Sequence, residues 1–165
     1  MVFCNTTPFI ALSSIHQLQL LEKIFGQIHV AQSVVEECAE GGPIRVPDLR
    51  TLSWVTSVAD VAESSLPMLF ELDRGEKQTI ALASNHPDST VIIDERLARS
   101  VAEYLGMRVT GTLGVLVKAK TLGLIPSFQD SAIAMQRQGI YYSEGLIKRL
   151  AKKLNENPSN QTLKP

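Results

Sequence analysis

The sequence has few of the residues that disulfide-rich proteins and thiolate metal sites depend on. Its two cysteines, Cys4 and Cys38, form no Cys-x-x-Cys or Cys/His cluster, which argues against a structural zinc site or a dithiol redox centre. We expect both to be small buried hydrophobic residues. The three histidines, His16, His29 and His86, have no evident partner in sequence, so they are interpreted as surface or packing residues.

An excess of charge of either sign is also missing. The chain has 16 basic and 17 acidic residues and a net charge of −1, so any contact with a nucleic acid must come from a local basic patch. No apolar run approaches the roughly 20 residues that span a bilayer, and the first residues lack the pattern of a signal peptide. We therefore expect a cytoplasmic protein that does not contact a membrane.

Apolar content is sufficient for one buried core. The 165 residues are 44% hydrophobic, which predicts one compact domain over 1–154, followed by a polar tail at 155–165 that we expect to be disordered. Short apolar runs predict strands at 1–4, 28–30, near 54, at 91–93 and at 107–110. Segments with helical periodicity lie between them, and this alternation predicts an α/β fold with a central parallel sheet.

Several residues predict where helices begin and end. Thr7 followed by Pro8 is typical of a cap and first helical position, and 13–14 is expected to divide that helix into two. Ser33 is predicted to cap the next helix, which ends before 41–43. Further helices are predicted at 76–84, at 97–105, from 112 towards 123, after 127 and at 146–154.

Acidic residues lie at predicted strand ends and helix starts. Asp94 directly follows the apolar run 91–93, Glu76 opens the next predicted helix upstream, and Glu37 lies on the helix after the second strand. The carboxyl ends of parallel strands meet at one edge of a sheet, so these acids are expected to converge there. Oxygen ligands suit Mg²⁺ or Mn²⁺, which needs only one or two direct carboxylates.

Each of these residues also has a structural interpretation. Acids in a first helical turn are stabilised by the helix dipole, which would explain Glu76 and Asp94 without a metal. Glu37 with its neighbour Glu36 would be the solvated face of a helix, and Asn5 would be a turn or cap residue. Gly111 to Gly114 lacks the phosphate-loop pattern and is better interpreted as a strand-to-helix turn. The basic face of the last helix could contact phosphates or simply be solvated.

Five motifs occur in an order that resembles a PIN-like domain family whose members begin with Asp/Asn-Thr-Ser-Pro-Leu-Ile and are related to toxin ribonucleases. They are NTTPFIAL at 5–12, VVEE at 34–37, GEKQTIALA at 75–83, IIDER at 92–96 and VTGTLGVL at 109–116. The resemblance covers roughly residues 1–150. It implies a three-layer α/β/α fold and Mg²⁺- or Mn²⁺-dependent ribonuclease chemistry, as in the toxins of toxin-antitoxin pairs.

The resemblance also implies which residues form the site. The acids of the family correspond to Glu37, Glu76 and Asp94, with Glu95 as an alternative ligand beside Asp94. The first acid of the family corresponds to Asn5, which removes one charge. The small hydroxyl residues that line the family's pocket correspond to Thr6 and Thr112.

Two functions follow from this set. The first is a metal-dependent endoribonuclease of the toxin type, weakened by Asn5, and the second is a PIN-like protein without catalysis that binds RNA or a partner protein. A small antitoxin-like protein is the expected partner under either hypothesis. A homodimer is also expected, to which the early apolar residues Phe9, Leu12 and Ile15 could contribute.

Overall fold

The centre of the structure is a five-stranded parallel sheet with strand order β3-β2-β1-β4-β5. The computed structural model describes residues 1–62 and 67–156, so most of the predicted tail lies outside the described residues. The strands are β1 (Val2–Cys4), β2 (Ile28–Ala31), β3 (Val55–Val58), β4 (Thr90–Ile92) and β5 (Arg108–Thr110). All five strands lie where the sequence predicts them, including the strand after Trp54.

The strand order places a switch point between β1 and β4. From β1 the chain proceeds to β2 and β3 on one side, and it then returns to β4 and β5 on the other side of β1. The register pairs Cys4 with Ile92, so β1 and β4 end at the same level. In open α/β sheets a crevice forms beyond the carboxyl ends of the strands at such a point. The residues that follow these two strands, Asn5 and 93–94, therefore lie together at this edge of the sheet.

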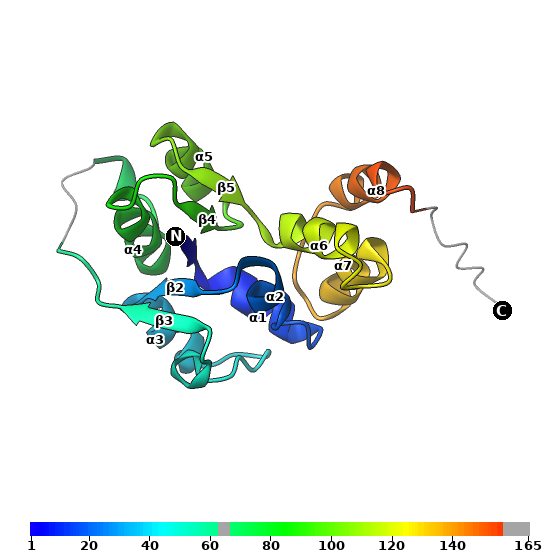
Figure 1. Cartoon of the computed structure of the whole chain (residues 1–165), viewed down its shortest axis with the longest axis horizontal. Coiled ribbons are helices and arrows are strands. Elements are labelled where there is room, and N and C mark those ends of the chain that lie inside the picture. The colour runs from blue at the N-terminus through cyan, green and yellow to red at the C-terminus, as the bar shows by residue number, and fades with distance from the viewer. Residues whose placement is uncertain (63–66, 157–165) are drawn as a thin grey trace.

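Helices flank the sheet and confirm the predicted α/β/α arrangement (Figure 1). The described residues contain α1 (Thr6–Ser14), α2 (Leu20–Phe25), α3 (Gln32–Glu40), α4 (Arg74–Ser84), α5 (Arg96–Tyr104), α6 (Thr112–Thr121), α7 (Phe128–Arg137) and α8 (Glu144–Lys153). Short 3₁₀ helices lie at Leu49–Thr51 and Pro67–Leu69. Helix α4 packs across β1, β2 and β4 and contacts α5, whereas α6 packs on α1 and α2.

Two of the predicted helix caps are wrong. Helix α1 is capped by Asn5 and begins at Thr6, so Pro8 is the third helical residue rather than the first. Proline is tolerated there because the first turn has no intrahelical acceptor for its N–H groups. Helix α3 begins at Gln32, and the backbone N–H of Ser33 donates to the Asp60 carboxylate at 3.0 Å. A distant acid thus provides the contact that a local cap would have made. The predicted division after 13–14 is confirmed, because α1 ends at Ser14.

Two apolar residues that were suggested for a dimer contact lie in the core instead. Phe9 and Leu12 are completely buried, so they cannot form the suggested dimer contact, and Ile15 is only partly exposed.

Cys4 and Cys38 are buried free thiols, as predicted. Burial and the nearby Asp94 raise the pKa of the Cys4 thiol well above its ordinary value, and burial together with Glu37 raises that of Cys38 to about 12. Neither thiol is therefore a nucleophile at neutral pH.

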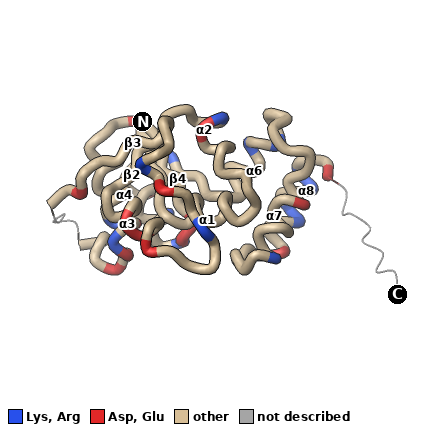
Figure 2. Tube along the Cα trace, turned by 90° about the horizontal axis from the view of Figure 1, so that it is seen from below, with Lys and Arg blue, Asp and Glu red and all other residues tan. Residues whose placement is uncertain are grey.

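Helices α7 and α8 form a pair beside α6, at the end of the molecule away from β3 (Figure 1). Basic and acidic residues are both present on this pair (Figure 2). The start of α7 is held by Glu156, whose carboxylate accepts hydrogen bonds from the backbone N–H groups of Phe128 and Gln129 at 2.7 and 2.8 Å. In the described part of the chain, no helix has the length and apolar character needed to cross a membrane.

Candidate functional site

Asn5 lies at the carboxyl end of β1, beside the end of β4. Its backbone N–H donates to the carbonyl oxygen of Ile92 at 3.0 Å, which extends the pairing of the two strands by one residue. The side chain is 2% exposed, and its Oδ1 atom has no hydrogen-bond partner among the described residues. Leaving a buried amide oxygen unpaired costs about 1–3 kcal/mol, so this atom is available for a donor or a cation.

Asp94 is held by the start of helix α6. The backbone N–H of Thr112 donates to Asp94 Oδ1 at 2.7 Å, and the Thr112 hydroxyl donates to Oδ2 at 2.6 Å. Thr112 makes both contacts and is fully buried, so its position is fixed by packing. Gly111 is required just before it, because a Cβ at that position would lie 2.6 Å from Asp94 Oδ1. The strand-to-helix turn at 111–112 therefore orients the Asp94 carboxylate.

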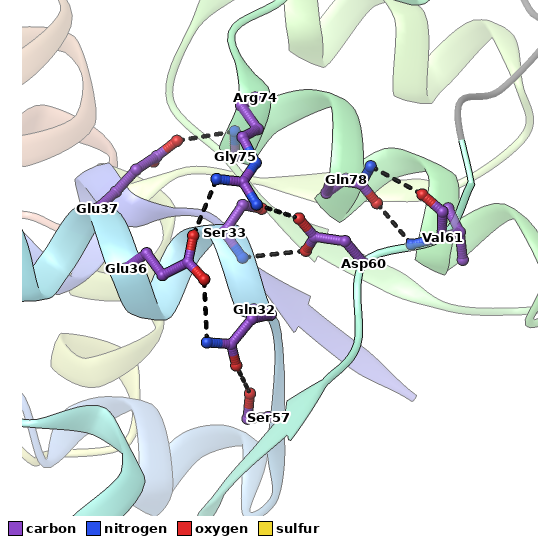
Figure 3. Close-up of polar contacts among 10 residues, drawn as sticks. All are labelled: Gln32, Ser33, Glu36, Glu37, Ser57, Asp60, Val61, Arg74, Gly75 and Gln78. Atoms are coloured by element: carbon purple, nitrogen blue, oxygen red, sulfur yellow. Dashed lines mark hydrogen bonds and ion pairs between the residues drawn. The ribbon is translucent and has the colours of Figure 1, made fainter.

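Glu37 is directed inwards from α3 and connects α1 with α4. Its carboxylate accepts hydrogen bonds from the Thr6 hydroxyl and from the backbone N–H of Gly75, the latter at 2.9 Å (Figure 3). A Cβ on Gly75 would lie 2.5 Å from Glu37 Oε2, so the close approach needs glycine. Thr6 follows Asn5 and Gly75 precedes Glu76, so Glu37 joins the two segments that carry these residues.

The neighbouring acid Glu36 has a different environment. Its exposed carboxylate pairs with Arg74 at 2.9 Å, and Arg74 also contacts Asp60 at 3.0 Å (Figure 3). The interpretation of 36–37 as a solvated face therefore holds for Glu36 only. Glu37 instead accepts from the backbone N–H of Gly75, the residue that follows Arg74 (Figure 3).

Glu76 combines a capping role with an unusual pKa. Its carboxylate accepts from the backbone N–H of Asp73 at 3.3 Å, and the Asp73 carboxylate accepts from the N–H of Glu76 at 2.8 Å, which completes a capping box. The side chain is 6% exposed. Burial first, and then the negative charges of Asp73, Glu95 and Glu37, raise the pKa of Glu76 to about 7, although its hydrogen bond from Asp73 opposes the shift. The protonated form of Glu76 is therefore favoured well above the pH range in which an ordinary glutamate ionises.

The structure separates the roles of Asp94 and Glu95. Glu95 is exposed and caps α5, where its carboxylate accepts from the backbone N–H of Ala98 at 2.8 Å. Its charge still contributes to the raised pKa of Glu76, so the two side chains lie near each other. Asp94, by contrast, is held by Thr112, the first residue of α6.

Two residues of the site were not found from the sequence. Tyr142, in the connection between α7 and α8, donates its hydroxyl to Asp94 Oδ2 at 3.0 Å across 48 residues of sequence. Burial and the Asp94 charge raise the pKa of Tyr142, so the hydroxyl stays protonated and acts as the donor. Arg99 donates to the carbonyl oxygen of Ile93 at 3.1 Å. The Tyr142 contact depends on tertiary packing, whereas Arg99 reaches Ile93 over only six positions but belongs to no motif that indicated it.

The available ligands are all oxygen atoms, as Mg²⁺ and Mn²⁺ prefer. Within residues 1–62 and 67–156, no three acidic, cysteine or histidine side chains are close enough to bind one metal ion together. The unpaired Asn5 Oδ1 suits a hydrated cation that takes most of its ligands from water, and the described residues do not fit a cation enclosed by protein alone. Whether these residues bind a metal stays a prediction.

Comparison with known proteins identifies the family. The family model described as PIN domain matches residues 1–156. No curated protein and no solved structure matches the chain. The match agrees with the five-stranded parallel sheet and its flanking helices, which form the three-layer arrangement that the sequence motifs predicted. PIN domains have a nuclease-type fold and generally use divalent metal ions. Because the match covers most of its length, this chain belongs to the PIN-domain family.

Proposed function

We propose that this protein is a metal-dependent endoribonuclease whose activity is limited by Asn5. The observation that carries the proposal is the position of Asn5 and Asp94 at the switch point of the sheet, with Glu37 and Glu76 on adjoining helices. The PIN-domain match supports a nuclease-type fold. The function class thus rests on both the family and the geometry of these side chains.

The residues have distinct roles in this proposal. Asp94 and the unpaired Oδ1 of Asn5 would be the direct ligands of a bound cation, and Glu76 and Glu37 would orient its water molecules. A bound Mg²⁺ or Mn²⁺ supplies an activated water and stabilises the charge that develops on the phosphate. Without metal the pKa of Glu76 is raised to about 7, and a cation beside it would lower that pKa, because the positive charge favours the ionised carboxylate.

Arg99 is the candidate for contact with the RNA phosphate. The position of a Cβ on Gly111 would be 2.8 Å from Arg99 Nη1 and 2.6 Å from Asp94 Oδ1, so the guanidinium and the carboxylate flank the same backbone position. Arg99 forms no ion pair with an acid among the described residues. Its charge is therefore available to a phosphate beside the acids.

The biological setting extends this proposal. We place the protein in the toxin type of PIN ribonuclease, with a small antitoxin-like protein as its inhibitor and a homodimer as its assembly. The five-motif resemblance supports this placement. A small open reading frame beside the gene would support the antitoxin, and sedimentation of the purified chain would test the dimer.

A PIN-like protein that binds RNA or a partner without catalysis is the alternative function. Asn5 favours it, because a neutral residue stands where the family has an acid. At ~4 Å and an effective dielectric of ~20, a missing charge removes up to ~4 kcal/mol of attraction for each unit of cation charge. The absence of a compact three-acid cluster among the described residues also favours it.

One substitution distinguishes the two functions. Under the nuclease hypothesis, Asn5→Asp restores the missing charge, so both Mn²⁺ affinity and cleavage of single-stranded RNA should rise above those of the unmodified protein. Asp94→Asn is the control and should abolish both. Under the binding hypothesis, the buried new carboxylate only adds repulsion and lowers stability. Tight Mn²⁺ binding by Asn5→Asp without cleavage would refute the nuclease.

A further inference from the structure

Tyr142 connects the C-terminal helices to the centre of the candidate site. Its hydroxyl donates to Asp94 Oδ2 at 3.0 Å, although the two residues are 48 positions apart. Asp94 follows β4 in the sheet, whereas Tyr142 lies between α7 and α8, whose pair packs beside α6. This hydrogen bond therefore joins two layers of the fold at a proposed metal ligand.

The Tyr142 side chain is held in place on its own side of the contact. Its backbone carbonyl accepts a hydrogen bond from Gln136 Nε2 at 2.8 Å, and its ring is partly buried against the core. The adjacent Tyr141 differs in this respect, since its side chain is 88% exposed. Consecutive tyrosines thus have one ordered hydroxyl at Asp94 and one ring in solvent.

The hydrogen bonds of Asp94 show which oxygen is available. Among the described residues, Oδ2 accepts from two hydroxyls, those of Thr112 and Tyr142, whereas Oδ1 accepts one hydrogen bond, from the backbone N–H of Thr112. A carboxylate oxygen accepts about two hydrogen bonds in its plane, so Oδ2 is saturated and Oδ1 keeps one open direction. The pair of hydroxyls therefore favours a single ligand atom, Oδ1.

We propose that Tyr142 is a positioning residue that fixes the rotation of the Asp94 carboxylate and so presents Oδ1 to a divalent cation. Partners that orient a metal ligand typically change metal affinity by about 10–100-fold when they are removed. This inference rests on the proposed function, because it requires that Asp94 binds a cation. It adds a residue from the connection between α7 and α8 to a site whose other residues follow β1 and β4 or lie on α3, α4 and α6.

The test compares Tyr142→Phe with Tyr141→Phe in the full-length protein. Titration with Mn²⁺, with the free ion followed by electron paramagnetic resonance, gives a Kd for each variant, and thermal unfolding without metal gives its stability. Tyr142→Phe keeps the ring and removes only the hydroxyl. We expect its Kd for Mn²⁺ to rise about 10-fold or more. Tyr141→Phe should keep the Kd of the unmodified protein.

Three other results would each contradict the proposed positioning role of Tyr142. An unchanged Kd in Tyr142→Phe, with or without a lower melting temperature, would give Tyr142 a structural role only and refute the proposal. A lower Kd would show that the hydroxyl competes with the cation, which also refutes it. If the unmodified protein does not bind Mn²⁺, the proposed function fails first, and the positioning role fails with it.

Discussion

The raised pKa of Glu76 predicts a pH-dependent loss of stability. Glu76 is buried close to Asp73, Glu95 and Glu37, and its pKa rises from 4.5 to about 7 in the folded protein. A folded state with the higher pKa binds the proton more tightly than the unfolded chain does. The stability that this proton provides is complete below pH 4.5 and is lost as the pH rises through 7.

The magnitude follows from the size of the shift. At about 1.4 kcal/mol per pKa unit, a rise from 4.5 to about 7 corresponds to about 3 kcal/mol of unfolding free energy. Glu76→Gln removes the charge but keeps an oxygen that can accept from the backbone N–H of Asp73, as a capping box allows. We therefore expect this variant to be about 3 kcal/mol more stable than the unmodified protein at pH 8. At pH 5 the two should differ little.

Thermal unfolding from pH 5 to pH 8 in metal-free buffer measures this difference. For a chain of this length, 3 kcal/mol corresponds to a melting temperature about 6–12 °C higher at pH 8. Glu103→Gln changes an exposed acid on α5 and is the matched control, for which we expect no pH-dependent gain. A gain in Glu76→Gln that is equal at pH 5 and pH 8 would show that the charge of Glu76 is not the cause.

Two further substitutions test other contacts of the site. Gly75→Ala places a Cβ 2.5 Å from Glu37 Oε2 and should displace that carboxylate, so Mn²⁺ binding measured by calorimetry should weaken. The control is Gly42→Ala, whose Cβ meets nothing within 4 Å, and it should leave Mn²⁺ binding unchanged. Equal Mn²⁺ affinity in both variants would contradict the role of Glu37. Arg99→Gln should weaken RNA binding and reduce its salt dependence by about one phosphate contact, while the affinity for Mn²⁺ stays the same. The control is Arg96→Gln, on the exposed start of α5, which should have the smaller effect on RNA binding. Identical salt slopes for these two arginine variants in fluorescence anisotropy would refute the phosphate contact.

Much of the fold is determined by local sequence signals. The runs at 28–31 and 90–92 contain β-branched residues and are too short for helices, so they indicate strands. The apolar residues of α5 and α8 recur with helical periodicity. Alternation of the two then requires a parallel sheet, because parallel strands need a crossover between them. The position of Asn5 directly after β1, and that of Asp94 two residues after the end of β4, follow from the same signals.

Only the tertiary structure decided which side chains meet. Both helix caps that were predicted wrongly depend on context, since Asn5 is placed by its bond to β4 and Ser33 by the distant Asp60. The raised pKa of Glu76 requires burial, which local sequence does not show.

The contacts of Asp94 are the clearest example. Its position after an apolar strand could be predicted from the sequence, because a run of three or four apolar residues specifies the strand. The partners that orient its carboxylate, Thr112 and Tyr142, come from segments 18 and 48 residues further along the chain. They reach Asp94 because β5 pairs beside β4 and because the C-terminal helices pack against α6. The sequence alone therefore determined where the acid lies on its strand, and packing between distant elements decided how that acid is held.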